Sequence, residues 1–188
     1  MTDVMLLWDN PLLFEKLFKE NDLKCQRILS TALGTPFLPA CKCVIIPTGF
    51  ANSAYTKILP GIERNGKAFE KFVSAGGVLV VFGALVTKYD HSWLPMQLTY
   101  IEKHGETHLH REGVHDAQCI VDDPGLAVEC DGYFSAADGD VILKNDDDQA
   151  VMVVKKVGAG MIIATSVHEF PSPGFLGCIT DNARRSKI

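Results

Sequence analysis

The chain has 188 residues, a length that fits one domain with a full hydrophobic core, and we treat residues 1–188 as a single domain. Hydrophobic residues make up 47% of it and charged residues 22%, which excludes an intrinsically disordered chain. The net charge is −5 and no run of Lys or Arg exceeds two residues, so a nucleic-acid surface is excluded.

Membrane and secretion signals are missing from the sequence. No apolar stretch reaches the roughly 18 residues that a membrane-spanning helix needs. The first residues lack the basic start and small-residue cleavage site of a signal peptide. We therefore expect a cytoplasmic protein with no membrane partner.

The first half of the chain alternates strand and helix patterns. Residues 4–8, 43–46 and 78–82 are short apolar runs, which is typical of strands covered on both faces, and residues 23–29 form a fourth candidate. Asn10 and Pro11 predict the start of a helix over the apolar stripe that follows them. A second helix is predicted around residues 68–73 and ends at Gly76. This order predicts a doubly wound parallel sheet.

The second half reads as shorter strands separated by Gly and Asp. Candidates lie at residues 98–103, 108–111, 118–121, 133–134 and 141–144, and a hairpin is predicted from 150–157 and 161–167 around Gly158. We interpret this half as an antiparallel β elaboration of the same domain. The predicted fold class is thus α/β and flavodoxin-like, with a mainly parallel doubly wound sheet.

The six cysteines are scattered, and only Cys41 and Cys43 form a C-x-C pair. No second pair lies at zinc-finger spacing, so we predict no metal site, and we expect no cofactor. A domain of this size without a secretion signal does not need disulfides, so we predict reduced structural thiols.

Three segments resemble the class I glutamine amidotransferase-like superfamily, including its trehalose-utilisation-type and biotin-protein-ligase N-terminal-type relatives. Residues 47–50 look like the family's glycine loop near the oxyanion site. Residues 76–83 resemble the strand that leads into the nucleophile elbow. Residues 160–169 resemble the strand that delivers the family's histidine. The resemblance implies a ligand site at the carboxyl ends of the strands.

The same resemblance implies that the family's reaction is lost. The nucleophilic Cys would fall on Gly83 or Ala84, neither of which forms an acyl-enzyme. The family's carboxylate would fall on Phe170, while Glu169 directly follows His168. We therefore expect no glutamine hydrolysis, and a non-catalytic or diverged domain that binds a small polar ligand or a partner subunit.

The candidate site gathers residues that follow the predicted strands. We assign tentative catalytic roles to His168 and Glu169, although His168 is equally explained as a strand-end side chain bonded to backbone. The expected ligand-binding residues are Asp9, Asn10, Gly49, Phe50, Asn52 and Gly83. We predict that His168 and the Gly49 loop share one pocket.

An alternative is a hydrolase of different chemistry, which uses His168 with Glu169 or a metal held by His108 and His110. His104, His108, His110 and His115 fall within twelve residues, with Glu106 and Asp116 beside them. A solvated hairpin explains the same residues. A structural subunit with a vestigial pocket is a second alternative. The sequence leaves open whether the protein forms a homo-oligomer.

Overall fold

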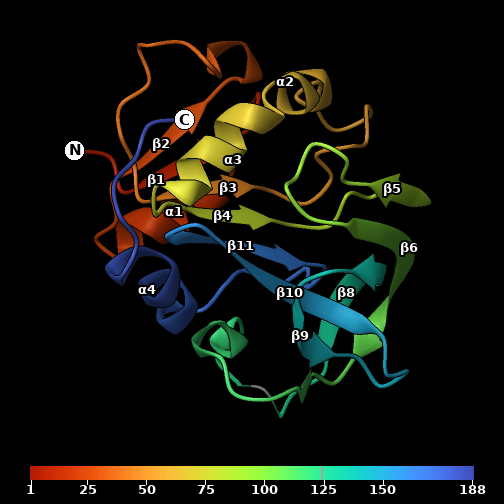
Figure 1. Ribbon diagram of the computed structural model, residues 1–188. Helices are drawn as coiled ribbons and strands as arrows, with labels where there is room; N and C mark the ends of the chain where they lie inside the picture. The colour runs from red at the N-terminus through yellow and green to blue at the C-terminus, as the bar shows by residue number, and fades with distance from the viewer. Residues whose placement is uncertain (124) are drawn as a thin grey trace.

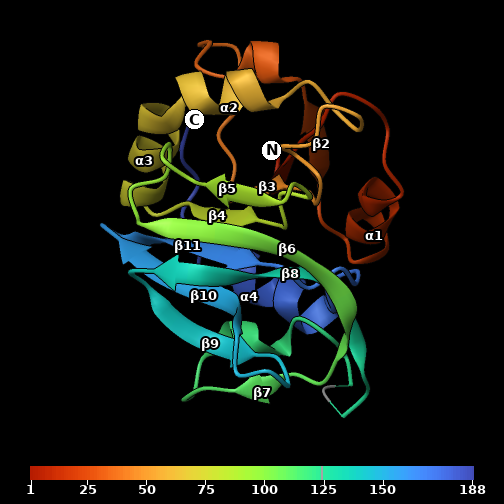
Figure 2. The same ribbon diagram turned by 90° about the vertical axis from the view of Figure 1, so that its right-hand side faces the viewer.

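The computed structural model describes residues 1–123 and 125–188. Its strands form one continuous sheet of eleven strands within this part of the chain, shown in Figures 1 and 2. The main path runs β2-β1-β3-β4-β11-β10-β8-β6-β5, and β7 and β9 pair beside it.

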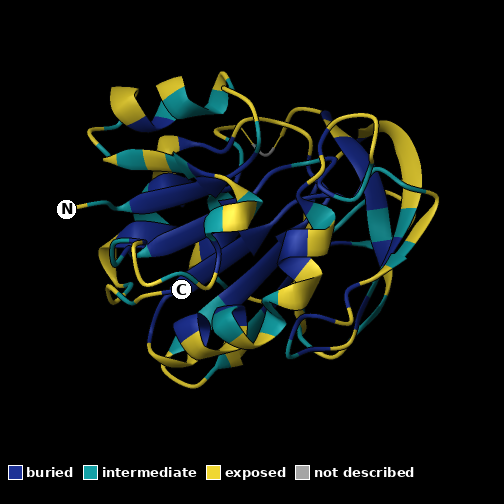
Figure 3. Ribbon diagram, turned by 90° about the horizontal axis from the view of Figure 1, so that it is seen from above, coloured by how far each residue is buried: buried dark blue, intermediate teal, exposed yellow. Residues whose placement is uncertain are grey.

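Five neighbouring strands run parallel. They are β2 (Cys25–Ile28), β1 (Val4–Leu7), β3 (Cys43–Ile46), β4 (Val78–Val81) and β11 (Gly160–Thr165). Every residue of β1, β3 and β4 is buried, which explains why these strands are unbroken apolar runs in the sequence. Figure 3 shows them as a buried band.

The remaining strands pair antiparallel. They are β5 (Lys88–Asp90), β6 (Leu98–Thr107), β7 (His110–Arg111), β8 (Val128–Ala137), β9 (Asp140–Lys144) and β10 (Ala150–Val157). A register shift between Glu102 and Gly105 bends the β6–β8 ladder. Figure 2 shows the long strand β6 curling away from the parallel strands.

The predicted flavodoxin-like, mainly parallel doubly wound fold is therefore wrong. The sheet is mixed and curled. The strands from the second half of the chain belong to the same sheet and do not form a separate elaboration. The β10–β11 hairpin joins the parallel and antiparallel parts of the sheet. Strand β11 pairs parallel with β4, and β10 pairs antiparallel with β11, β8 and β9. Periodicity in sequence reports which faces are buried and carries no information on pairing direction.

Few helices cover the sheet. They are α1 (Phe14–Glu20), α2 (Leu59–Arg64), α3 (Gly66–Ser74) and α4 (Pro173–Asp181), with short 3-10 turns η1 (Ser30–Ala32) and η2 (Asp116–Cys119). Side chains alternate along β1, so Met5 and Leu7 pack toward α2 and α3 while Val4 and Leu6 pack toward α1 and α4. None of the helices in the described ranges is both long and apolar enough to cross a bilayer.

Two local predictions fail for identifiable reasons. Asn10 does not cap α1, which begins only at Phe14, and the Glu15 carboxylate accepts the Leu12 N–H there. Residues 118–121 do not form a strand, because the His115 ring accepts the Ala117 N–H and caps η2 instead.

Candidate functional site

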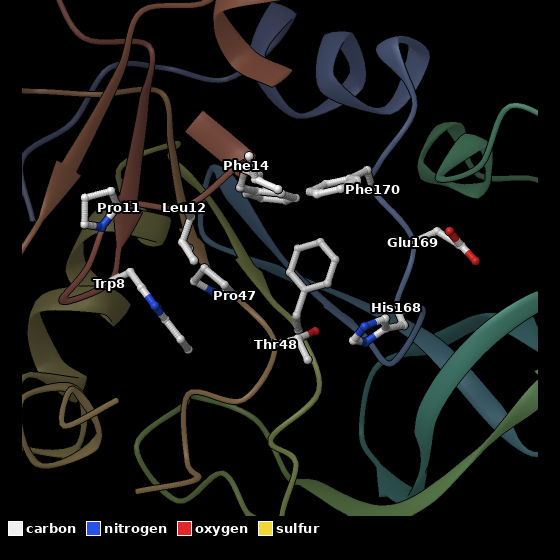
Figure 4. A pocket seen from close by; sticks show the side chains of 11 residues that line it. Trp8, Pro11, Leu12, Phe14, Pro47, Thr48, His168, Glu169 and Phe170 are labelled. Carbon is white, nitrogen blue, oxygen red and sulfur yellow. The ribbon is translucent and has the colours of Figure 1, made fainter. Parts of the chain in front are cut away.

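A pocket of about 570 Å³ opens at the carboxyl ends of the parallel strands. Each of β1, β3, β4 and β11 contributes residues from just beyond its last position, and the segment entering α1 closes one side. Figure 4 shows the side chains that line it. The lining residues are Trp8, Pro11, Leu12, Leu13, Phe14, Pro47, Thr48, Phe82, His168, Glu169 and Phe170.

His168 contacts a carboxylate behind the pocket wall. Its Nδ1 lies 2.7 Å from Oδ1 of Asp131, whose side chain is fully buried, whereas the His168 side chain is 45% exposed. Backbone hydrogen bonds hold the two segments together, from Asp131 N to Ser166 O and from His168 N to Glu129 O. His168 therefore lines the pocket while its Nδ1 contacts a buried acid.

The environment of Asp131 combines burial with nearby positive charge. Burial raises the pKa of the Asp131 carboxyl, while the charge of His168, the Thr48 hydroxyl and the charge of His104 act against that rise. His104 Nδ1 lies 3.7 Å from the same Oδ1, and the two imidazole rings meet edge to face at 6.2 Å. Neither buried oxygen receives a well-aligned hydrogen bond from the described residues.

Gly83 makes room for this carboxylate. A Cβ at Gly83 would lie 3.0 Å from Asp131 Oδ2 and 3.1 Å from the Asp131 Cβ. Gly83 O also accepts the Gly49 N–H at 2.8 Å, and the Asn52 amide donates to Leu85 O at 2.9 Å. The structure thus brings the Gly49 loop, the Gly83 turn and His168 together around Asp131.

The predicted ligand-binding residues do not line the pocket, and this holds for all six of them: Asp9, Asn10, Gly49, Phe50, Asn52 and Gly83. Asp9 accepts hydrogen bonds from the Thr56 hydroxyl and the Lys57 N–H, which ties two loops together. Asn10 is exposed and does not line the cavity. Phe50 is fully buried and packs edge to face against Trp93. These contacts give Asp9 and Phe50 structural roles.

Glu169 does not pair with His168. Its carboxylate accepts the Glu129 N–H at 3.3 Å, and Figure 4 shows it pointing away from the imidazole. The partner is Asp131, which sequence reasoning missed because residues 133–134 were the only part of β8 predicted as strand. A usable signal existed, since Asp131 sits between Cys130 and Gly132 in an otherwise strand-like segment.

The histidine cluster does not form a metal site. His108 Nδ1 and His110 Nε2 lie 3.2 and 2.7 Å from the two oxygens of Asp146. The His108 N–H and the His110 ring hold the pKa of that carboxyl well below its usual range. His115 caps η2 and His104 faces Asp131. No group of three or more metal-ligating side chains with suitable geometry occurs in the described ranges.

None of the cysteines lines the pocket in the part of the chain described here, and all six are free. Burial raises the pKa of Cys25, Cys41 and Cys130 to about 12 and that of Cys178 to about 11. These thiols are poor nucleophiles near neutral pH. The turn after β4 begins with Phe82, Gly83 and Ala84, and none of these side chains is a nucleophile.

No family model matches the chain. No curated protein matches it either. Several solved structures share its fold. A β-galactosidase from Bacillus circulans sp. alkalophilus has a TM-score of 0.53 at 12% identity, covering 96% of this chain and 30% of that one. A β-galactosidase from Halorubrum lacusprofundi has a TM-score of 0.57 at 13% identity, with coverages of 97% and 30%. A cytoplasmic protein from Salmonella typhimurium LT2 has a TM-score of 0.56 at 13% identity, with coverages of 94% and 93%.

These neighbours overturn the predicted relationship. They are glycosidases and a cytoplasmic protein, so the assignment to the class I glutamine amidotransferase-like superfamily is wrong. Short segments such as residues 47–50 occur in many unrelated folds wherever a strand meets a tight turn. Their resemblance to the family's loops therefore does not indicate a relationship. The chain spans 30% of the length of the β-galactosidases, and at this identity the likeness shows the fold alone.

Proposed function

We propose that the protein is a hydrolase in which His168, oriented by Asp131, acts as the general base for a water molecule. The observation that carries this proposal is the 2.7 Å contact between His168 Nδ1 and the buried Asp131 carboxylate, at the wall of a pocket. A carboxylate close to Nδ1 favours the tautomer that carries its proton there, which leaves Nε2 to accept a proton. No described cysteine competes as nucleophile there.

The reaction that fits this geometry is the hydrolysis of an ester. His168 Nε2 takes a proton from water while the water oxygen bonds to the carbonyl carbon of the substrate. The C–O bond to the leaving group then breaks, and the imidazolium returns the proton to the departing alkoxide. The products are a carboxylic acid and an alcohol, and water is the one co-reactant.

The pocket argues against two other functions. A non-catalytic amidotransferase-like domain for a small polar ligand is not supported, because the walls are mostly apolar and the family relationship is wrong. Glycosidase chemistry needs two carboxyl groups about 5–9.5 Å apart on either side of a sugar. Glu169 is the one carboxylate among the lining residues, and it points away from His168.

The proposal is tested by acid release from simple methyl esters, followed at constant pH with purified protein. Replacing His168 with Ala is expected to lower kcat/KM by about 10²–10⁴-fold, the usual contribution of a positioned base. His110→Ala is the matched control, because His110 also contacts an aspartate but lies at Asp146. Equal rates for wild type and His168→Ala would refute the proposed function.

A cytoplasmic location forms part of the proposal, supported by the six free thiols. We expect thiol titration of the denatured, unreduced protein to find close to six reactive groups. Four or more paired cysteines after anaerobic handling would contradict a reducing compartment.

A further inference from the structure

We propose that the pocket selects substrates with a flat, uncharged aromatic acyl group, which seats against the rings of Phe14 and Phe170. This inference rests on the proposed function, because it names the substrate class of the same site. It adds a specificity-determining residue, Phe170, to the chemistry assigned to His168.

The walls exclude charged and sugar-like ligands. Of the eleven lining residues, three are polar (Thr48, His168 and Glu169) and the other eight are apolar. Neither Lys nor Arg is among them, so an anionic group would lose its hydration without gaining a partner. A sugar carries several hydroxyls, and three polar side chains do not replace the water that those hydroxyls shed.

The aromatic side chains form a prepared stacking surface. The Phe14 ring lies edge to face with Phe18 at 5.4 Å and with Phe82 at 5.8 Å, which fixes its orientation. Phe170 lies nearly parallel to Phe14, with centroids 5.6 Å apart and an interplanar angle of 29°. These separations are those of favourable aromatic pairs, so a third flat ring can join the stack.

Phe170 is held at the pocket although water surrounds much of it. The side chain is 58% exposed, and the neighbouring Leu13 is 78% exposed. Large apolar side chains that gather on a concave surface mark a binding site more often than scattered ones do. An aromatic ligand would cover both residues.

Position in the chain connects recognition to chemistry. Phe170 follows His168 by two residues on the segment between β11 and α4, and Figure 4 shows both side chains bordering one hollow. A ring seated against Phe14 and Phe170 would therefore occupy the same pocket that His168 lines. The volume of about 570 Å³ far exceeds what an acetyl group fills, and it lies within the usual range for small-molecule sites.

The test compares methyl esters that differ only in the acyl group, namely acetate, cyclohexanecarboxylate, benzoate and 3-phenylpropanoate, because methanol leaves no aromatic group to confuse the result. Binding is measured separately, by the change in tryptophan fluorescence on titration with 3-phenylpropanamide, because Trp8 lines the pocket and Trp93 does not. Phe170→Ala is expected to weaken aromatic binding and to raise KM for the aromatic esters by about tenfold relative to its effect on KM for the acetate. Phe37→Ala, a 90% exposed residue outside the pocket, is the control.

The outcomes separate this inference from the proposed function. Turnover that depends on His168 but shows no aromatic preference and no effect of Phe170→Ala overturns the inference alone. Binding of 3-phenylpropanamide that depends on Phe170, without turnover of any ester, overturns the proposed hydrolase and keeps the ligand class. Absence of both binding and turnover in protein with a native circular dichroism spectrum overturns both.

Discussion

Two aspartates of this protein each contact two histidines, but one aspartate is buried and the other is exposed. Asp131 is fully buried behind the pocket, with His168 and His104 on one oxygen. Asp146 lies in the exposed turn between β9 and β10, with His108 and His110 on separate oxygens. Burial raises the pKa of the Asp131 carboxyl, whereas hydrogen bonds lower that of Asp146.

Under the proposed function, the same residue types serve chemistry at Asp131 and structure at Asp146. Asp131 is a buried carboxylate without aligned donors, and its close contact is the His168 ring at the wall of the pocket. Asp146 is also bonded by the His108 N–H and shares a hydrogen bond with the Thr107 hydroxyl, so it closes a loop. Four experiments sharpen or break this contrast.

The largest effect is expected for Asp131→Asn. The amide keeps the shape but not the charge that holds the His168 tautomer, so kcat/KM for ester hydrolysis should fall by about 10²–10⁴-fold. Asp146→Asn is the matched change in the exposed cluster and should leave kcat/KM unaltered. Equal losses in both variants would erase the distinction between the two sites.

A stability effect is expected for Gly83→Ala. The new methyl group would lie 3.0 Å from Asp131 Oδ2 inside a packed wall, so we expect a loss of about 1–3 kcal/mol in the free energy of unfolding. Gly105→Ala is the control, because nothing lies within 4 Å of a Cβ there. Urea denaturation measures both. A Gly83→Ala protein as stable as the control would show that the carboxylate is not tightly enclosed.

The two aspartates should act on stability in opposite directions as pH changes. Asp131 has a raised pKa in the folded state, so its contribution is greatest below the usual carboxyl value and is lost as pH rises through the folded pKa. Asp146 has a lowered pKa, so its contribution is present above the usual value and is lost as pH falls.

Urea denaturation between pH 3 and 7 measures this contrast. The stability deficit of Asp146→Asn should shrink toward acid. Asp131→Asn should gain on the wild type as pH rises, because the charged carboxylate is the costly form. Parallel pH profiles for the two variants would contradict the assigned environments.

Sequence reasoning located β1, β3 and β4 because every residue in these strands is buried. Residues 4–8 and 78–82 were predicted as strands, and β1 and β4 fall inside them. Helix α4 was missed because Pro173, Gly174 and Gly177 look like breakers, although Pro173 occupies the first turn behind a Ser172 cap.

The site was only half predictable for a physical reason. His168 and the glycine turns follow strands whose carboxyl ends lie at one edge of the sheet. Their convergence can therefore be predicted from the order of strands along the chain. Asp131 reaches His168 only because residues 130 and 167 form an antiparallel bridge. Pairing between distant segments is decided by the whole sheet, and no local pattern encodes it.

The most direct test of the central claim is a double-mutant cycle in kcat/KM for ester hydrolysis, with His168→Ala, Asp131→Asn and the combined variant. Groups that act as one unit are strongly non-additive. We expect the double variant to be no slower than His168→Ala alone, because Asp131 works through the imidazole it contacts at 2.7 Å. Losses that multiply in the double variant would contradict a coupled His168–Asp131 base.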